Sequence, residues 1–450
     1  MVIIDSQKEL DLICKKLQTD SLLFVPIYSN DYIHTRMQSI CLMWVHFLED
    51  KSDYVILTNH SECLFKTEPA IIFNNLNYNN LKFILDYKDI INKDAVEIKN
   101  GIDLEMLQYL DNGNKLILPH FITQDQFKSV YPRYPKLNEL VPVTKWIEYF
   151  NIIKPTLLNL VSSYNPIDRA CKYYNEIVLP SISKIENNGL KVSVEKINKN
   201  IMKSVNVNSD DIMFTQYNIC TTTGRPSNRF NTINFAALNK ESGIRETFIS
   251  RFENGSLVEF DFESYHLRII GNLIDYKLPL ESIHEYLGKQ YFNKDVLTDD
   301  EYEQSKQISF RQLYGGVMNE YKHIKFFADT EKYIETIWKQ WKRVGYIESP
   351  VSGRRLYKKN YPVLNAQKLF NYLIQLLETE INMNKIFELN KFLTKYNTKL
   401  VLYTYDSFLF DFDFNDGKRC IKGIEKILQE GNYLVRKYVG ANYNDMKEIK

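Results

Sequence analysis

The first 120 residues alternate between short apolar runs and polar turns. Four of these runs are rich in β-branched and aromatic residues, which is typical of buried strands. A later segment, residues 103–110, spaces its leucines and methionine as a helix does. The pattern predicts an α/β domain at this end of the chain. The runs expected to form strands are 21–29, 37–48, 53–59 and 70–76.

The second half of the chain combines isolated apolar strands with longer helices. Residues 255–261 form an apolar run that ends on Asp261. Residues 399–413 form two apolar runs around Tyr405, Asp406 and Ser407, which indicates a hairpin. Helices are expected over residues 263–274, over 306–315 with an end at a Gly-Gly pair, and over 367–386.

Asp261 and Asp406 each stand at the tip of an otherwise apolar strand. A carboxylate buried there without a partner costs several kcal/mol, so it usually faces water, a cation or a substrate. Two carboxylates on neighbouring strand ends can hold divalent metal ions together with substrate phosphates. The alternative is that each aspartate is a turn residue, a position that aspartate often occupies.

The helix expected over 306–315 carries Lys306, Phe310 and Tyr314 at intervals of four residues. Residues with this spacing share one face of a helix. That face offers a cation for phosphates and two rings for a sugar and a base. An aromatic stripe is more often simple core, but polar residues interrupt this helix and its Gly-Gly end allows close approach to a ligand.

Composition limits the remaining possibilities. The 450 residues are 44% hydrophobic and 25% charged, and the net charge is +1, so any basic groove for nucleic acid has to be local. Six scattered cysteines without a CxxC pair argue against a zinc site or a disulfide framework. No apolar run approaches the roughly 20 residues of a membrane span. We therefore expect a soluble intracellular protein that does not engage a membrane.

The order of these segments resembles DNA polymerase family A, the polymerase I family. The stretch DFESYHLR resembles its first palm motif, KQISFRQLYGG its fingers helix and TYDSF its third motif. The resemblance implies that Asp261, the backbone carbonyl of Phe262 and Asp406 hold two Mg²⁺ ions, for which Mn²⁺ can substitute. It further implies that Lys306 contacts the incoming triphosphate, Phe310 the sugar and Tyr314 the templating pair.

Four shorter segments match the family in the same order: 221–235, 282–284, 352–357 and 370–375. They imply that His284 assists the triphosphate. They also imply a set of DNA contacts, to which Tyr405 is added because it stands where the family has His. The residues expected to contact DNA are Arg225, Asn231, Asn234, Arg354, Arg355, Asn371, Gln375 and Tyr405.

Several positions depart from the family pattern. His266 replaces a Glu that narrows the ribose site and contacts the residue at Tyr314, so discrimination against ribonucleotides is either altered or preserved by the similar bulk of His. Ser407 replaces a second acidic residue, for which Glu263 is a candidate substitute because it shares a strand face with Asp261. Tyr302 stands where Arg is usual, so the grip on the triphosphate is either weaker or relies on Arg311.

Two further departures concern whole domains. Only about twenty residues separate the thumb-like segment 179–201 from residue 221, so the thumb is minimal, and weak DNA binding or a processivity partner that replaces it is expected. The N-terminal domain resembles the family's 3′–5′ exonuclease, yet Val25, Ile27 and Asn79 occupy acidic positions, and only Tyr164 and Asp168 keep the pattern. One carboxylate cannot hold two Mg²⁺ ions.

The expected fold is α/β (α+β), with an RNase H-like exonuclease-type domain followed by a right-hand palm and fingers with a minimal thumb. The leading interpretation is a compact, phage-like DNA polymerase without proofreading that uses primer-template DNA and deoxynucleoside triphosphates. The alternatives are a non-catalytic DNA-binding or assembly subunit of a replication complex, and a primase or RNA-polymerising variant. The expected divisions are 1–175 exonuclease-like, 176–220 thumb remnant, 221–270 palm, 271–369 fingers, and 370–450 palm.

Overall fold

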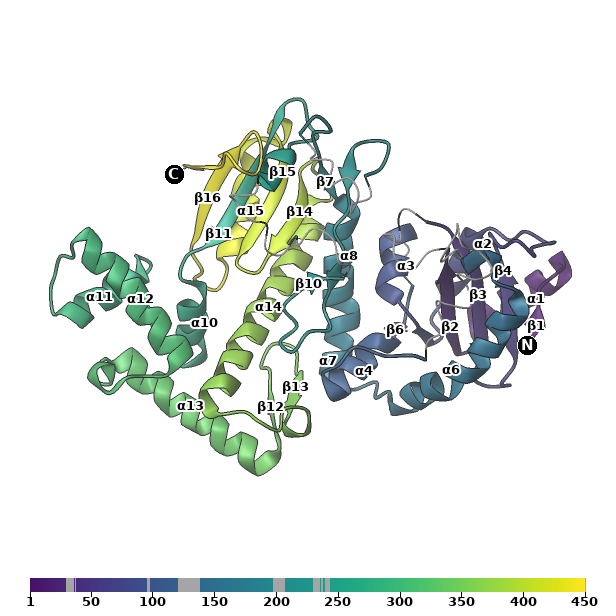
Figure 1. Ribbon diagram of the computed structural model, residues 1–450, viewed down its shortest axis with the longest axis horizontal. Helices are drawn as coiled ribbons and strands as arrows, with labels where there is room; N and C mark the ends of the chain where they lie inside the picture. The colour runs from purple at the N-terminus through teal and green to yellow at the C-terminus, as the bar shows by residue number, and fades with distance from the viewer. Residues whose placement is uncertain are drawn as a thin grey trace. The chain divides into compact units, whose positions relative to one another are not determined.

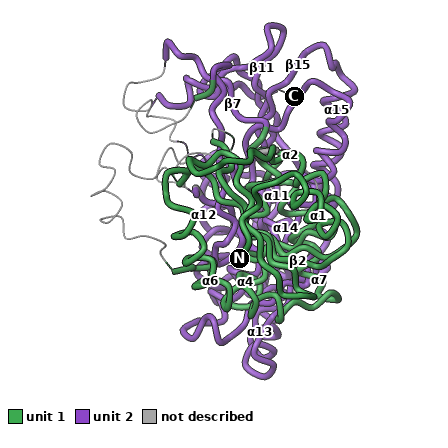
Figure 2. Tube along the Cα trace, turned by 90° about the vertical axis from the view of Figure 1, so that its right-hand side faces the viewer, with its two compact units in different colours: residues 1–187, 206–208 green, residues 188–205, 209–450 purple. Residues whose placement is uncertain are grey.

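The computed structural model describes the chain except residues 30–35, 37, 95–97, 120–137, 197–206, 230–234, 236–237, 239–242 and 450. The chain divides into two compact units, which Figure 2 colours separately. Unit 1 comprises Met1–Asn187 with Asn206–Asn208, and unit 2 comprises Asn188–Val205 with Ser209–Lys450. Each unit is described by itself.

Unit 1 is built on a six-stranded mixed sheet with the order β1-β4-β3-β2-β5-β6. Strands β2, β3 and β4 are antiparallel neighbours, whereas β5 and β6 run parallel to β2. Three antiparallel strands joined to two parallel ones agree with the expected RNase H-like domain. The strands are β1 (Val2–Ile3), β2 (Leu22–Tyr28), β3 (Ile40–Phe47), β4 (Asp53–Leu57), β5 (Lys82–Ile84) and β6 (Gly101–Asp103).

The core of unit 1 forms where one long helix packs its apolar face on this sheet. Trp146, Phe150, Ile153 and Leu157 are buried at helical spacing on α6, and the Phe150 ring stacks on Trp44 of β3 with centroids 4.9 Å apart. The helices of the unit are α1 (Gln7–Thr19), α2 (Pro69–Leu76), α3 (Tyr87–Asp94), α4 (Leu104–Asn112), η2 (Asn138–Leu140), α6 (Val143–Ser163), α7 (Arg169–Tyr173), η3 (Tyr174–Val178) and α8 (Leu179–Asn188).

Three of the four runs expected to form strands do so, but the fourth, residues 70–76, lies in helix α2. Pro69 occupies the first turn of α2, where its missing N–H costs nothing. Ile72, Phe73 and Leu76 are the buried residues, and this spacing fits one helical face. A short apolar run does not by itself distinguish a strand from a helix. Here Pro69, which suits the first turn of a helix, favours the helix.

The division expected at residue 175 falls inside unit 1. Helix α7 passes without a break through η3 into α8, so the chain does not leave the unit there. The carboxylate of Glu186 near the end of α8 is fully buried and accepts hydrogen bonds from Lys88 and Asn92, each at 2.7 Å. This buried ion pair ties α8 to α3. The rest of the expected thumb remnant, up to residue 220, includes 197–206, which lie outside the described residues.

Unit 2 contains a five-stranded antiparallel sheet with the order β14-β15-β11-β16-β17. The hairpin expected around Tyr405 is confirmed, because β14 and β15 are joined by a turn in which Tyr405 has φ 60°. Helices α14 and α15 pack together beside the sheet (Figure 1). The elements are β11 (Gly255–Phe262), β14 (Lys399–Thr404), β15 (Ser407–Asp413), β16 (Val435–Gly440), β17 (Lys447–Ile449), α14 (Ala366–Leu393) and α15 (Gly417–Gln429).

A helical layer stands at one end of this sheet, made of α10 (Tyr265–Leu273), α11 (Ile283–Phe292), α12 (Asp299–Gly315) and α13 (Lys325–Val344). Helix α12 begins with a capping box between Thr298 and Glu301 and ends at Gly316, whose φ of 97° suits glycine, so the expected Gly-Gly end is confirmed. Shorter elements complete the unit: β7 (Leu190–Lys191), β8 (Ile212–Met213), β9 (Tyr217–Asn218), β10 (Ser227–Asn228), β12 (Tyr346–Glu348), β13 (Arg355–Tyr357), η4 (Ile244–Thr247), η5 (Asn319–Tyr321), η6 (Lys358–Asn360) and η7 (Phe414–Asp416).

No helix in the described part of the chain has both the length and the apolar character needed to cross a membrane.

The turn between β12 and β13 is fastened to the middle of α14 by a buried carboxylate. Glu380 accepts hydrogen bonds from the hydroxyls of Ser349 and Ser352, the latter at 2.6 Å. Arg354 of the same turn is 1% exposed and donates to the carbonyl of Thr222 at 3.0 Å. The expectation that Arg354 contacts DNA is therefore wrong, because its guanidinium is buried and donates inside the protein.

Arg355 lies on the outside of the same turn. Its guanidinium pairs with Glu348 at 2.9 Å and stacks over the Tyr346 ring at 4.7 Å, with its side chain 46% exposed. The predicted DNA contact of Arg355 stays a prediction.

We expect Glu380 to make the stability of unit 2 depend on pH. Burial raises the pKa of Glu380 from 4.5 to about 7. The folded chain therefore holds a proton that the unfolded chain releases above pH 4.5, so this contribution to stability is complete below that pH and is lost as the pH rises through 7. In Glu380→Gln this part of the decline should vanish in calorimetric unfolding between pH 4.5 and 7.5. The control is Glu388→Gln, an exposed position of the same helix; parallel curves for wild type and Glu380→Gln would contradict the assignment.

Candidate active site

The two strand-end carboxylates come from neighbouring strands, as expected. The antiparallel register places Asp261 of β11 opposite Ser407 of β15, and the N–H of Phe262 donates to the carbonyl of Asp406 at 2.9 Å. The left-handed conformation of Tyr405 reverses the chain just before Asp406. Both aspartates therefore stand at the same end of the two central strands. Asp406 as a residue is exposed to solvent, but the surrounding protein partly desolvates its carboxyl and so raises its pKa. The nearby Glu378 raises the pKa of Asp406 further.

A small pocket opens beside Asp261 and holds charged groups from three elements. It has a volume of about 170 Å³ and includes Asp261, Glu263, Lys306 and Arg436 in its lining; we call it the charged pocket. Lys306 of α12 pairs with Glu303 at 2.6 Å and lies 4.5 Å over the Tyr302 ring. Arg436 of β16 pairs with Glu263 at 3.2 Å. Two cations held near carboxylates by partly exposed ion pairs suit a ligand that carries both phosphates and metal ions.

A second pocket, of about 250 Å³, adjoins the first and is lined by rings; we call it the aromatic pocket. Phe310 and Tyr314 of α12 lie nearly parallel, with an 8° interplanar angle and centroids 6.3 Å apart, and they are 51% and 43% exposed. The expected shared face of Lys306, Phe310 and Tyr314 is thus present, with the lysine in one pocket and the rings in the other. Exposed parallel rings can stack on a planar ligand.

His284 stands between the pockets and lines both. Its imidazole is buried, and the centroid of this ring lies 6.0 Å from the centroid of the Phe310 ring. Burial lowers its pKa to about 4, and Lys306 adds to the decrease. His284 is therefore neutral near pH 7, and its Nδ1 has no hydrogen-bond partner within the described residues. A neutral ring with an unused nitrogen can orient a ligand by hydrogen bonding without adding charge.

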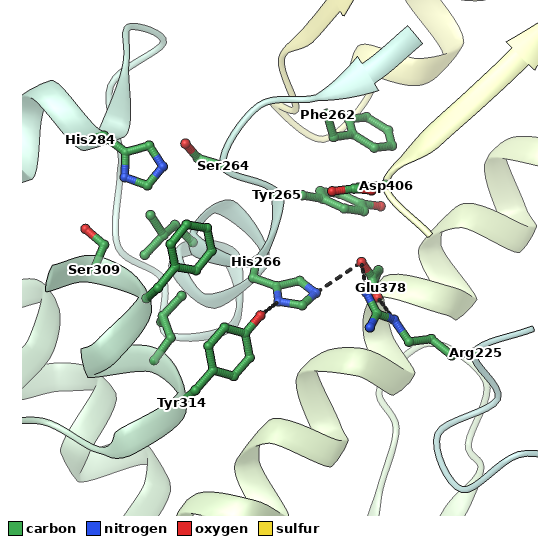
Figure 3. Close-up of a pocket in the computed structure, with 13 residues that line it drawn as sticks. Arg225, Phe262, Ser264, Tyr265, His266, His284, Ser309, Tyr314, Glu378 and Asp406 are labelled. Carbon is green, nitrogen blue, oxygen red and sulfur yellow. Dashed lines mark hydrogen bonds and ion pairs between the residues drawn. The ribbon is translucent and has the colours of Figure 1, made fainter. Parts of the chain in front are cut away.

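His266 is the centre of a chain of polar contacts that closes one side of the aromatic pocket (Figure 3). Its Nδ1 lies 2.7 Å from the Tyr314 hydroxyl, which confirms the expected contact between these two residues. Its Nε2 lies 3.1 Å from Glu378 Oε1. Arg225 holds the same carboxylate through Nε at 2.6 Å and a second nitrogen at 3.1 Å, and stacks over the Tyr405 ring at 4.2 Å.

Glu378 is the main site residue that sequence reasoning missed. Its side chain is only 2% exposed, and burial by itself would raise its pKa. The contacts with His266 and Arg225 outweigh burial, so the pKa of Glu378 lies below its ordinary value and it stays a carboxylate. The available signal was helical spacing: Asn371, Gln375 and Glu378 lie four and three residues apart on one face of α14.

The remaining residues expected to touch DNA are only partly located. Asn371 donates to the carbonyl of Tyr314 at 3.4 Å, and Gln375 accepts from Thr223 at 3.3 Å, so both face the segments around the aromatic pocket. Arg225 lines that pocket, yet its guanidinium is occupied by Glu378. Asn231 and Asn234 lie outside the described residues.

Arg311 does not belong to the charged pocket, contrary to expectation. One residue advances a helix by about 100°, so Arg311 is turned away from the face that carries Lys306 and Phe310, and it is exposed. Arg436 supplies the second cation instead. Sequence reasoning missed it because the pairing of β16 with β11, which sets Arg436 opposite Asp261, is not visible in the local pattern.

Ser407 does not face either pocket. Its hydroxyl donates to Glu259 at 2.6 Å, and the Tyr443 hydroxyl donates to the same oxygen at 2.9 Å. Glu263 does line the charged pocket together with Asp261, as the substitution hypothesis requires. Whether it takes the part of the second acidic residue stays a prediction.

The exonuclease-like residues of unit 1 do not assemble a comparable site. Val25 is fully buried in β2, and Asp168 caps helix α7 by accepting from the N–H groups of Ala170 and Cys171. In the part of the chain that the structure describes, no three His, Cys, Asp or Glu side chains gather as a metal site would require. This holds for both units, so a metal at Asp261 and Asp406 would need ligands from its substrate.

Comparisons with known proteins bear on the fold. No protein-family model matches the chain, and no curated protein does. Among solved structures, the chain is similar to the POL domain of Pol1 from M. smegmatis, in complex with DNA primer-template and dNTP. The identity is 13% and the TM-score 0.73, with 99% of this chain and 100% of that chain covered. At this identity the likeness shows the fold alone, and the mixed α/β architecture expected from the sequence is confirmed.

Proposed function

We propose that this chain is a template-directed DNA polymerase that adds deoxynucleotides to a primer 3′ end and does not proofread. The observation that carries the proposal is the convergence of two strand-end carboxylates, Lys306 and a stacked pair of rings on two adjoining pockets. Phosphoryl transfer asks a protein mainly for positioning and electrostatic stabilisation. The pockets offer both, on a fold that in a solved relative is bound to primer-template and dNTP.

The donor set fits Mg²⁺. This ion is usually held by one or two carboxylates together with substrate phosphates, so Asp261, Asp406 and the Phe262 carbonyl are sufficient ligands when a triphosphate is present. When bound, the metal supplies a more nucleophilic primer hydroxyl and neutralises charge on the phosphates.

Each other residue then has a task that follows from its surroundings. Lys306 and Arg436 bind the triphosphate oxygens, and Lys306 is placed to return a proton to the leaving pyrophosphate. Phe310 and Tyr314 stack on the sugar and the base, and neutral His284 donates or accepts one hydrogen bond between the pockets. The Arg225–Glu378 pair and Tyr405 form the wall toward the primer-template.

The proposal that the chain does not proofread is supported by the residues of unit 1. A two-metal exonuclease needs several carboxylates, whereas β2 offers Val25 and Ile27 and Asp168 is occupied as a helix cap. We expect unit 1 to act as a scaffold or docking surface.

The proposal is tested by primer extension with Mg²⁺, comparing wild type with Asp406→Ala. A metal ion contributes several kcal/mol to the transition state, so extension should fall about a thousandfold or more. Asp300→Ala, an exposed aspartate in the first turn of α12, is the matched control and should extend like wild type. Wild type that binds primer-template but adds no nucleotide would instead favour a non-catalytic subunit.

A second experiment tests which arginine grips the triphosphate. Loss of a charge-assisted hydrogen bond should raise the KM for deoxynucleotides about tenfold in Arg436→Ala. Arg311→Ala removes an arginine of the same helix as Lys306 that lies outside the charged pocket, so its KM should change less than about twofold. Steady-state kinetics on one template position measures both values. Equal increases in the two variants would contradict the assignment of Arg436.

A further inference from the structure

We propose that Asn382 is a positioning residue that fixes the place of Asp406 by holding the peptide unit in front of it. This inference rests on the proposed function, in which Asp406 binds a metal ion. The observation behind it is a fully buried amide on α14 that is hydrogen-bonded both to the β14–β15 turn and to the start of α10.

Asn382 continues the polar face of α14. It lies four residues after Glu378, which is about one helical turn further along the same face. Its side chain is fully buried, so the amide needs partners inside the protein. Oδ1 accepts from the Tyr265 hydroxyl at 2.6 Å, whereas Nδ2 donates to the Tyr403 hydroxyl at 3.0 Å and to the carbonyl of Tyr405 at 2.6 Å. Both ends of the amide are therefore engaged.

The hydrogen bond to Tyr405 acts on the residue that follows it. A peptide unit is planar and includes the Cα atom of the next residue, so holding the Tyr405 carbonyl also holds the Cα atom of Asp406. Tyr405 has a φ of 60°, a left-handed conformation that a bulky residue keeps only where its surroundings stabilise it. Asn382 stabilises it from α14, a helix that is not part of the hairpin.

The other end of the amide is connected to the strand that carries Asp261. Tyr265, which donates to the amide, stacks on the Phe262 ring with centroids 4.1 Å apart and an interplanar angle of 18°. The N–H of Phe262 in turn donates to the carbonyl of Asp406 at 2.9 Å. Phe262, Tyr265 and Asp406 all line the aromatic pocket (Figure 3). One amide is thus connected to both segments that carry the proposed metal ligands.

A site with few protein ligands depends on how accurately each one is placed. In the described part of the chain no three His, Cys, Asp or Glu side chains gather as a metal site, so no further carboxylate compensates for a displaced one. Mg²⁺ requires a nearly ideal octahedral arrangement of its ligands. Loss of a partner that orients a metal ligand lowers metal affinity by roughly 10–100-fold. Removing the amide of Asn382 should therefore weaken the binding of metal at Asp406.

The first measurement is hydrogen–deuterium exchange of the backbone amides in the β14–β15 turn, which needs neither metal nor substrate. Asn382→Leu keeps the approximate volume of the side chain and none of its hydrogen bonds, so exchange in the turn should become about tenfold faster. Tyr265→Phe keeps the ring that stacks on Phe262 and removes one hydroxyl, so exchange should become about threefold faster. Unchanged exchange in Asn382→Leu, or in Tyr265→Phe if the leucine variant does not fold, would overturn the proposal.

The matched control is Ser256→Ala, near the opposite end of β11. It removes a buried hydrogen bond of the same sheet, from the Ser256 hydroxyl to the carbonyl of Gly440 at 2.8 Å. Exchange in the β14–β15 turn should be the same in this variant as in wild type. Equal acceleration in Ser256→Ala and Asn382→Leu would mean that any loss of stability loosens the turn, and the proposal would fall.

The second measurement is the Mg²⁺ concentration that gives half-maximal primer extension. In Asn382→Leu this concentration should rise about tenfold, and excess Mg²⁺ should restore most of the lost rate. Ser256→Ala should keep the Mg²⁺ dependence of wild type. A purely structural role of Asn382 predicts instead that the rate falls by the same factor at every Mg²⁺ concentration, and that result would overturn the proposal.

The two measurements separate this inference from the proposed function. If wild type extends no primer, the proposed function fails, while the exchange data still decide whether Asn382 holds the turn. If wild type and Asn382→Leu both extend primers with the same Mg²⁺ dependence, the polymerase assignment stands and the positioning role of Asn382 is wrong.

Discussion

The antiparallel pairing of β11 with β15 determines where every reactive group of unit 2 can stand. Because Asp261 lies opposite Ser407, the tight turn at Tyr405 brings Asp406 to the end of β11. A slip of one residue would send Asp261 to the other face of the sheet. The pairing with β16 then sets Arg436 beside Asp261. The helices contribute cations and rings to a place that this register has already defined.

Helix α14 shows how strongly the surroundings decide the state of a buried carboxyl. Glu378 and Glu380 are two residues apart and both are almost fully buried. Glu378 meets His266 and Arg225, and its pKa falls; Glu380 meets two serine hydroxyls, and burial raises its pKa to about 7. One helix therefore carries a permanent charge on the side of the aromatic pocket and a proton-dependent group on the side of the β12–β13 turn.

Local pattern was enough to locate the strand-end aspartates, the hairpin and the face of α12, because each depends on residues close in sequence. It failed where partners are distant. Glu378 acquires its importance from Arg225 and His266, which are more than a hundred residues away, and Arg436 from a strand pairing across the sheet. Arg354 was expected at the DNA because residues 352–357 resemble a basic turn of the polymerase family, whereas the fold buries its side chain. The run at 70–76 was misassigned because apolar content alone does not distinguish the two periodicities.

The spacing of Asn371, Gln375 and Glu378 on α14 also limits how this chain can change length. An insertion of one residue between Asn371 and Glu378 would rotate one of them by about 100° and shift it by about 1.5 Å relative to the other. The helix would then present a different face to the aromatic pocket, although its own hydrogen bonds would be intact. Length variation among relatives should therefore accumulate in surface connections such as the segment before α11, while α14 keeps its residue count between these positions.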